Sequence, residues 1–293
     1  MPSRNKWVDK FEGLFWRFAV SGFLPAKWFQ IPVPGEEDRA AKTGPLKLEI
    51  VSHCWNYHHL LVYQLASLVR DPPQNTTVRM TVFYAAEDTK TKALLDTFSE
   101  TEVPGVTWNW QVLAPSHLRR RSIGRSQAAL ATEADWIWFA DCDLMFRDQC
   151  LDALAEQLQG RRDILVYPRE EQVTVALESD NPILHFDGTN PLEADVDADL
   201  FHPSYPTRAT GPLQITHGDV ARACGYCKHI KYYQSPADAW SKTYEDRAYR
   251  WLLGTQGTPI DFKGASRIRH VAKGRYTGSK LNSGIRAWIR RFD

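Results

Sequence analysis

The chain has 293 residues, of which 43% are hydrophobic and 24% are charged, and its formal net charge is +1. These values are ordinary for a globular protein, and the length is sufficient for one large α/β domain. The near-neutral charge excludes the strong global field that attracts nucleic acid, so no nucleic-acid partner is expected. Five cysteines without a recognisable disulfide framework indicate a reducing, cytoplasmic setting.

Residues 1–45 are predicted to form an N-terminal arm and linker. The aromatic stretch FEGLFWRFAVSGFLPAKWF (11–29) is interrupted by Glu12, Arg17 and Pro25, so it predicts neither a transmembrane helix nor a signal peptide. Two interpretations stay open: an arm packed against the domain, or a segment at the membrane interface. The tail GIRAWIRRFD is also aromatic and basic. Both termini could therefore bring the protein to the inner face of a membrane as a peripheral contact.

Strands and helices alternate from residue 46 onwards, and 46–293 is predicted to be one domain. Apolar runs predict strands at 46–53, 78–85, 106–113, 134–140 and 163–169. Helical spacing predicts helices at 55–70, 88–98, 122–134 and 147–159. This alternation predicts an α/β fold with a mostly parallel central sheet and helices on both faces.

The pattern dissolves between about 170 and 211, where Pro, Asp, Asn and Gly are frequent. A loop this long inside a compact domain is usually functional or flexible. We expect this segment to help select the acceptor of the reaction considered below. Order resumes with a strand and a helix over 212–227, a helix over 243–253 and a late strand over 265–272.

Asp141 and Asp143 follow directly after the buried strand ending at residue 140. Ligands of open α/β sheets bind at the carboxyl ends of strands. Two carboxylates this close repel each other and are costly to bury, so a divalent cation with oxygen ligands is the simplest counter-charge. Two enzyme classes use this pattern: phosphatase-type hydrolases, in which the first Asp is a nucleophile, and nucleotide-sugar transferases. The mid-chain position and Met145, where the hydrolases usually have Thr or Val, favour the transferases.

Six segments, which follow one another over roughly residues 46–275, are similar to the motifs of a known enzyme family. They are IVSHCWN, YAAED, IGRSQAALATEADWIWFADCD, GPLQITHGDVARACGY, YEDRAYRW and RIRHVAKGR. Together they resemble the GT-A fold glycosyltransferases, most closely family 2. ADCD is similar to the family's DADD-type motif, and IGRSQ to its GxARN motif, with Ser126 where Asn is usual. The resemblance implies a hexosyltransferase that uses a nucleoside-diphosphate sugar, most simply a UDP-sugar, with Mn²⁺ or Mg²⁺. The acceptor would be the hydroxyl of a glycan or a lipid-linked molecule.

The resemblance also implies roles for particular residues. Asp246, next to Glu245, would be the general base of an inverting reaction, although TYED also fits a capping box from Thr243 to Asp246. The metal ligands would be Asp143, Asp141 and His270. The nucleotide-binding residues would be Ser52, His53, Glu87, Asp88, Arg125, Asp141, Lys273 and Arg275. The donor sugar and acceptor would meet Gly211, Gln214 and Trp251.

Three alternatives stay open at this point. A retaining transferase of the same fold would use a similar set of residues. A phosphatase-like hydrolase would use Asp141 as its nucleophile. A non-catalytic binder of sugar nucleotides would have the same pocket without turnover.

Overall fold

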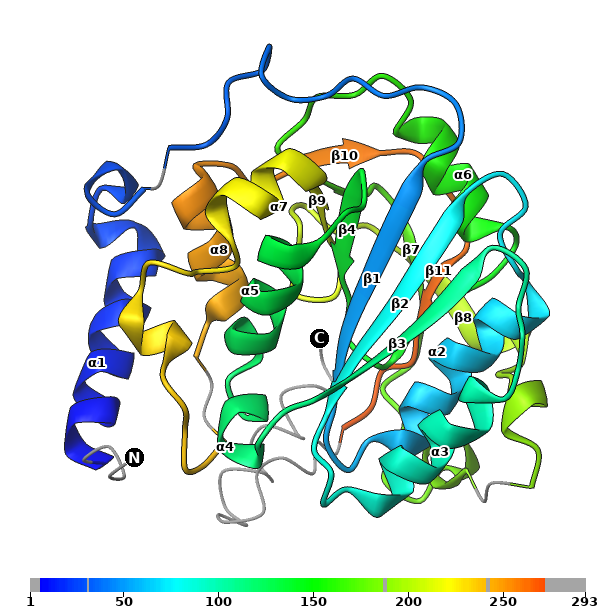
Figure 1. The fold of residues 1–293 in the computed structure, drawn as a ribbon. Coiled ribbons are helices and arrows are strands. Elements are labelled where there is room, and N and C mark those ends of the chain that lie inside the picture. The colour runs from blue at the N-terminus through cyan, green and yellow to red at the C-terminus, as the bar shows by residue number, and fades with distance from the viewer. Residues whose placement is uncertain (1–5, 31, 187–188, 241–242, 272–293) are drawn as a thin grey trace.

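The computed structural model describes residues 6–30, 32–186, 189–240 and 243–271 (Figure 1). The α-helices are α1 (Lys6–Phe18), α2 (His58–Arg70), α3 (Thr89–Ser99), α4 (Pro115–Leu118), α5 (Arg121–Ala131), α6 (Cys150–Gln157), α7 (Gly218–Cys224) and α8 (Glu245–Leu253). The strands are β1 (Lys47–Cys54), β2 (Thr77–Tyr84), β3 (Val106–Val112), β4 (Trp136–Phe139), β5 (Leu144–Phe146), β6 (Leu165–Pro168), β7 (Glu171–Thr174), β8 (Phe201–Ser204), β9 (Gln214–His217), β10 (Thr258–Ile260) and β11 (Ala265–Arg267). Short helices of other types are η1 (Ala19–Phe23), η2 (Ala26–Trp28), η3 (Pro182–His185), η4 (Pro191–Glu193), η5 (Ala198–Leu200) and η6 (Lys231–Gln234).

The central sheet has seven strands in the order β10-β6-β9-β4-β1-β2-β3 (Figure 1). Strand β1 pairs in parallel with both β2 and β4, β2 with β3, and β10 with β6. Strand β9 alone in this sheet is antiparallel to its neighbours, β4 and β6. The predicted α/β fold with a mostly parallel central sheet is therefore confirmed.

Each face of this sheet buries its own hydrophobic core. Along β4, Trp136 and Trp138 pack into the core beneath α2, α3 and α6, whereas Ile137 and Phe139 pack into the core beneath α5, α7 and α8. All four side chains are almost fully buried. A strand covered on both faces needs apolar residues at every position, which is why this segment reads WIWF without alternation.

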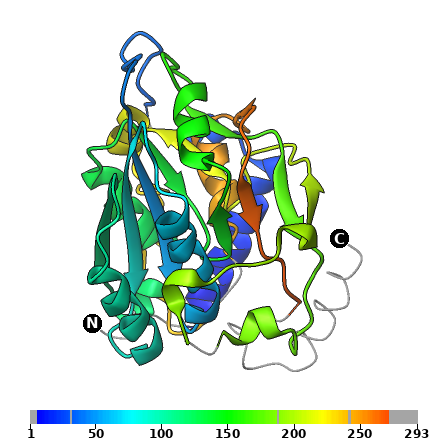
Figure 2. The same cartoon turned by 90° about the vertical axis from the view of Figure 1, so that its right-hand side faces the viewer.

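A second sheet, in the order β5-β11-β7-β8, lies beside the central one. Figure 2 shows its strands β11 in orange and β8 in yellow-green. Strands β7 and β8 lie within 170–211, which the sequence predicts to be a long loop, so this segment has more regular structure than expected. The pairings of β7 with β8 and β11 join residues far apart in sequence, so no local pattern reveals them.

The late strand predicted over 265–272 is shorter, because β11 spans Ala265–Arg267 and only an isolated bridge joins His270 to Leu177. The run ADWIWFADCDLMF is also divided between the two sheets. Strand β4 ends at Phe139, and β5 begins at Leu144 and pairs antiparallel to β11. The chain leaves the central sheet at this point, so Asp141 and Asp143 lie in the connection between the two sheets.

The N-terminal arm contains α1, which lies at the edge of the domain beside the yellow segment that carries η6 (Figure 1). Trp16 contacts Phe29 and Tyr233, with ring centroids 5.4 and 6.3 Å apart. Asp9 forms an ion pair of 2.9 Å with Arg120. These contacts attach the helix to the domain. In the described part of the chain, no helix combines the length and the hydropathy needed to cross a membrane.

Candidate active site

A crevice is expected where β1 and β4 end, because this is the point at which the strand order reverses. The chain moves from β1 through α2 to β2 on one side, and returns through α5 to β4 on the other side of β1. Helices α2 and α5 therefore lie on opposite faces of the sheet. Ligands of open α/β sheets bind at such a switch point, outside the carboxyl ends of the strands. Asp141 and Asp143 lie at this end of β4.

Asp141 is neutralised by two arginines of α5. Its Oδ1 accepts hydrogen bonds from Nη1 of Arg121 at 2.5 Å and from Nη2 of Arg125 at 3.3 Å. The fully buried Arg125 also donates to the carbonyl oxygens of Ala140 and Gly211. The negative charge of Asp141 is the main cause that raises the pKa of Arg121. The protein itself thus supplies the counter-charge for the first carboxylate.

Asp143 has a different environment. Its side chain is buried, and Oδ1 has no hydrogen-bond partner in the described part of the chain. Its backbone carbonyl accepts from the amide of Ile268 at 2.9 Å, which holds the turn against the strand β11 segment. Arg267 is a nearby positive charge: burial lowers its pKa, but the hydrogen bonds that it donates to Glu171 and the charges of Glu171 and Asp143 raise it overall. Asp143 therefore keeps one buried carboxylate oxygen available for a further ligand.

The donor set fits a hard divalent cation that relies on few protein ligands. Across the described residues, no group of three or more His, Cys, Asp or Glu side chains converges as a complete metal site. Mg²⁺ and similar ions commonly bind one or two carboxylates and take their other ligands from water and substrate phosphates. An orphaned carboxylate oxygen of Asp143 suits that role, whereas Oδ1 of Asp141 is already occupied by arginines.

The acidic pair Glu245 and Asp246 begins α8. The predicted capping box is wrong: the residue before the helix is Tyr244, at φ 57°, no side chain caps it, and the carbonyl of Thr243 accepts a hydrogen bond from Tyr233 instead. Glu245 is buried with Oε2 3.9 Å from Nε of Arg121. Asp246 is half-buried and lies in the first helical turn, at the positive end of the helix dipole.

A hydrogen-bond chain connects the end of β4 to α8. Arg125 donates to the hydroxyl of Tyr226 at 3.0 Å, and that hydroxyl donates to Oε1 of Gln214 at 2.7 Å. The amide of Gln214 donates to the carbonyl of Asp246 at 3.0 Å. Gly211 lies beside Asp246, since a Cβ added to it would be 3.8 Å from the Cβ of Asp246. The structure thus brings Asp141, Arg125, Gln214, Gly211 and Asp246 together.

Tyr226 and Arg121 complete this assembly, and sequence reasoning did not assign either to the site. Tyr226 occurs in the motif GPLQITHGDVARACGY, but nothing local distinguishes it from a core tyrosine. Arg121 belongs to the basic run of Arg119, Arg120, Arg121 and Arg125, for which the sequence predicts only that one member meets phosphate. The available signal was that a buried tyrosine hydroxyl must find a hydrogen-bond partner.

Ser52 and His53 lie near the carboxyl end of β1, at the switch point of the sheet. The Ser52 hydroxyl donates to Gln64 of α2 at 2.7 Å, and the amide of Gln64 donates to the carbonyl of Asp141 at 3.0 Å. His53 stacks on Phe83, and its Nε2 would be 2.3 Å from a Cβ added to Gly124. Ser52 therefore helps to position the backbone of Asp141 through Gln64. A nucleotide-binding role for Ser52 or His53 stays a prediction.

The remaining predicted residues are more widely distributed. Asp88 caps α3, accepting from the amide of Thr91, and its Oδ2 also accepts from the amide of Asn56 at 2.6 Å. Glu87 is exposed. Trp251 donates to the carbonyl of Leu24 at 3.4 Å and so contacts the N-terminal arm. The predicted residues Lys273 and Arg275 lie outside the described residues.

His270 lies in a cavity of about 430 Å³ that is lined by several basic side chains. They are His58, His59, His185, His270 and Lys90. Burial, followed by repulsion from the other histidines and Lys90, lowers the pKa of His59 to about 4. The cavity adjoins the loop after β1, since Asn56 and Tyr57 also line it. It offers hydrogen-bond donors for an anion.

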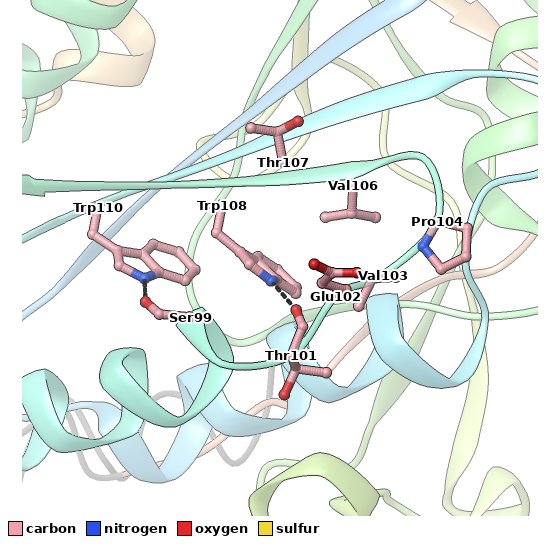
Figure 3. A pocket seen from close by; sticks show the side chains of 9 residues that line it. All are labelled: Ser99, Thr101, Glu102, Val103, Pro104, Val106, Thr107, Trp108 and Trp110. Carbon is pink, nitrogen blue, oxygen red and sulfur yellow. Dashed lines mark hydrogen bonds between the residues drawn. The ribbon is translucent and has the colours of Figure 1, made fainter.

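A cavity of about 690 Å³ lies elsewhere, at the outer strand β3. Figure 3 shows Trp108 and Trp110 side by side in it. The indole nitrogen of Trp108 donates a hydrogen bond to the carbonyl oxygen of Thr101, and that of Trp110 donates to the hydroxyl of Ser99. The lining of this cavity includes Val103, Pro104 and Val106, at the amino end of β3. This is the opposite end of the sheet from Asp141 and Asp143, so its size does not make it the candidate site.

Known proteins were compared with the chain. No protein-family model and no curated protein matches its sequence. Among solved structures, it is similar to the mannosyltransferase PcManGT from Pyrobaculum calidifontis in complex with GDP-Man and Mn²⁺, at 16% identity and a TM-score of 0.45, covering 97% of this chain and 69% of that chain. It is also similar to residues 1–349 of S. aureus TarS in complex with UDP-GlcNAc, at 11% identity and a TM-score of 0.47, covering 84% of this chain and 66% of that chain. These likenesses are too low to carry an argument, so the fold class rests on the strand pairings of this chain.

Proposed function

We propose that this chain is a GT-A-type glycosyltransferase that moves a hexosyl group from a UDP-sugar to an acceptor hydroxyl with inversion. The observation that carries this proposal is Oδ1 of Asp143, which is buried at the switch point of a mostly parallel sheet and has no hydrogen-bond partner among the residues that the structure describes. The motif order in the sequence supports the choice of transferase. The acceptor would be a glycan or a lipid-linked molecule.

The donor diphosphate would lie over the end of β4. Asp143 would hold Mn²⁺ or Mg²⁺, and the bound ion would supply charge stabilisation for the leaving diphosphate. Arg121 and Arg125 keep Asp141 ionised and oriented, because both guanidinium groups contact its Oδ1. Gln64 fixes the backbone of the same residue through its carbonyl. These contacts preorganise the turn before any ligand arrives.

Asp246 would accept the proton of the acceptor hydroxyl as that oxygen attacks the anomeric carbon. The carboxylate is half-buried, lies in the first turn of α8, and is close to Gly211, where an added Cβ would be 3.8 Å from the Cβ of Asp246. Arg250 places a positive charge beside it, with Nη1 3.6 Å from Oδ2 of Asp246. An ionised carboxylate within reach of the hydroxyl is the requirement for general-base catalysis.

Calorimetric titration of UDP into the full chain, with and without Mn²⁺, tests the proposal. We expect wild type to bind UDP only with the metal, and Asp143→Asn to lose about tenfold or more in affinity. Asp96→Asn is the matched control, since Asp96 is exposed on α3 and pairs only with Lys92. If neither UDP nor GDP binds wild type under any condition, the proposal is wrong.

The role of Asp246 is tested separately. Asp246→Asn should bind UDP and metal normally but transfer sugar at least about a hundredfold more slowly. Near-normal turnover would remove Asp246 from this role. NMR of the anomeric configuration of the product distinguishes inversion from the retaining alternative.

The hydrolase alternative requires Asp141 to act as a nucleophile. The two arginines on its Oδ1 weigh against this, because they stabilise the carboxylate charge and so lower its nucleophilicity. Such an enzyme would form an acyl-phosphate on Asp141, which hydroxylamine traps. Trapping at Asp141 with a phosphorylated substrate would favour the hydrolase over the transferase.

A further inference from the structure

Helix α1 is attached to the domain along one face only. Trp16 packs against Phe29 and Tyr233, and Asp9 pairs with the fully buried Arg120. At Gly13, an added Cβ would be 2.6 Å from the hydroxyl of Tyr232, so the helix is in close contact there. The positions 9, 13 and 16 follow helical spacing, so they form one docked face.

The opposite face is apolar and exposed. Trp7 is 77% exposed, Phe11 78%, Leu14 70% and Phe18 51%. Phe18 stacks on Phe23, itself 67% exposed, at a centroid distance of 4.2 Å. The helical spacing of the first four places them in one line along the 13-residue helix, roughly 20 Å long. We call these five residues the apolar stripe. An exposed stripe of this kind marks an interaction surface.

Basic side chains border the apolar stripe. Lys10 lies with Nζ 5.6 Å from the ring centroid of Trp7, and Arg17, directly before Phe18, lies over the ring of Tyr244. Lys27 is exposed shortly after the stripe. Of the two acidic residues of α1, Asp9 is paired with Arg120 and Glu12 is half-buried. Aromatic rings flanked by Lys and Arg are the composition of helices that lie in the interface of an anionic bilayer.

We propose that the apolar stripe of α1 binds the surface of an anionic lipid bilayer, with the helix lying in the plane of the interface. The rings would enter the headgroup region, where Trp is favoured, and Lys10 and Arg17 would meet lipid phosphates. A second copy of this chain is a poorer partner, because it would bring an identical basic border to the same contact. The aromatic composition of the apolar stripe and the basic side chains beside it therefore favour a bilayer over a second copy of this chain.

The docked face of α1 also connects the bilayer to the candidate site. Asp9 holds Arg120, and the next residue, Arg121, contacts Asp141 and Glu245. An enzyme held at this face would have its crevice at a fixed orientation to the membrane. This consequence rests on the proposed function, and it assigns the acceptor to the class of membrane-bound, lipid-linked molecules. Bilayer binding itself does not depend on the enzymatic activity.

Flotation of the full chain with vesicles tests the proposal without any donor or metal. Wild type should float with phosphatidylcholine vesicles that contain phosphatidylglycerol, and bind pure phosphatidylcholine more weakly. The double variant Phe11→Ser/Leu14→Ser should lose about tenfold or more in binding, because both side chains leave the apolar phase. Lys10→Glu/Arg17→Glu should remove the preference for anionic vesicles, and added salt should weaken wild-type binding.

Tyr205→Ser is the matched control, since Tyr205 is an aromatic residue 66% exposed outside α1. It should float as wild type does, and the double variant should keep the wild-type thermal midpoint because both replaced side chains are exposed. The proposal is overturned if wild type does not float, or if the double variant floats equally well. If wild type does not float and is a dimer that Phe11→Ser makes monomeric, the stripe is a contact between copies instead. UDP titration measures the proposed function independently, so the two failures are distinguishable.

Discussion

Asp141 and Asp143 are two residues apart, yet their surroundings differ in kind. Asp141 faces α5 and shares its Oδ1 with two arginines, one of them fully buried. Asp143 faces the second sheet, and one of its buried oxygens has no hydrogen-bond partner in the described part of the chain. A carboxylate that the protein neutralises is a structural anchor, whereas a buried carboxylate left incomplete is suited to an external cation. The same residue type thus serves two purposes according to which neighbour the fold supplies.

The largest expected effect on stability comes from removing Arg125, the fully buried partner of Asp141. Arg125→Met would remove the donor that Arg125 supplies to Tyr226, to the carbonyl groups of Ala140 and Gly211 and to Asp141, which keeps Arg121. We expect the free energy of unfolding to fall by about 3–5 kcal/mol, measured by urea denaturation. Arg169→Met is the control, because its ion pair with Asp261 is exposed and should contribute less than about 1 kcal/mol. A loss below about 1 kcal/mol in Arg125→Met would contradict the anchor role.

The two carboxylates can be compared directly by isosteric replacement. Asp141→Asn should lower the free energy of unfolding by about 1–3 kcal/mol, because it removes the charge that pairs with two arginines. Asp143→Asn should change the metal-free protein by less than about 1 kcal/mol, since no hydrogen bond to Oδ1 is lost. Thermal or urea unfolding of both variants measures the difference. Equal losses in the two variants would remove the distinction drawn above.

Gly124 tests how closely α5 must approach the sheet to position its arginines. A Cβ on this residue would be 2.3 Å from Nε2 of His53 and 3.0 Å from the Phe83 ring. Gly124→Ala should therefore displace α5 and lower the free energy of unfolding by about 1–3 kcal/mol. Gly211→Ala, whose new Cβ would meet nothing closer than 3.8 Å, should leave stability nearly unchanged. Two equally stable variants would show that α5 tolerates the shift.

The smallest expected effect on the free energy of unfolding comes from His59 in the histidine cavity, and this effect depends on pH. The pKa of His59 is lowered to about 4 in the folded protein, mainly by burial. Because the unfolded chain binds the proton first, stability should decrease as pH falls from about 6.5 towards 4 and not change from this cause above 6.5. Because His59 is partly exposed and solvent screens its interactions, we expect the free energy of unfolding to decrease by about 1–2 kcal/mol over this pH range.

Urea unfolding of the metal-free protein at several pH values measures this dependence. His59→Gln should flatten the profile between pH 6.5 and 4, while His229→Gln, at an exposed position, should leave it as in wild type. A profile for His59→Gln identical to wild type would contradict the assignment.

Much of the fold could be predicted because short stretches of the sequence show which residues are buried. The run WIWF predicted a strand covered on both faces, and the alternation of strands and helices after residue 46 indicated a mostly parallel sheet. Asp88 stands at the start of a predicted helix, is of a residue type that favours the N-cap position, and caps α3. These features depend on residues a few positions apart, which a linear pattern contains.

The details of the site depend on contacts over long separations. Arg125 meets Tyr226 across 101 residues, Asp141 accepts from Arg121 across 20, and the start of α8 at Glu245 overrides the local capping pattern. The second sheet likewise joins β7, β8 and β11 from separate parts of the chain. The sequence by itself determined where the strands end and hence where two carboxylates emerge. Only the tertiary structure decided that Asp141 is paired with two arginines, whereas Oδ1 of Asp143 has no hydrogen-bond partner among the described residues. The partners of a buried charge are chosen by packing between distant elements.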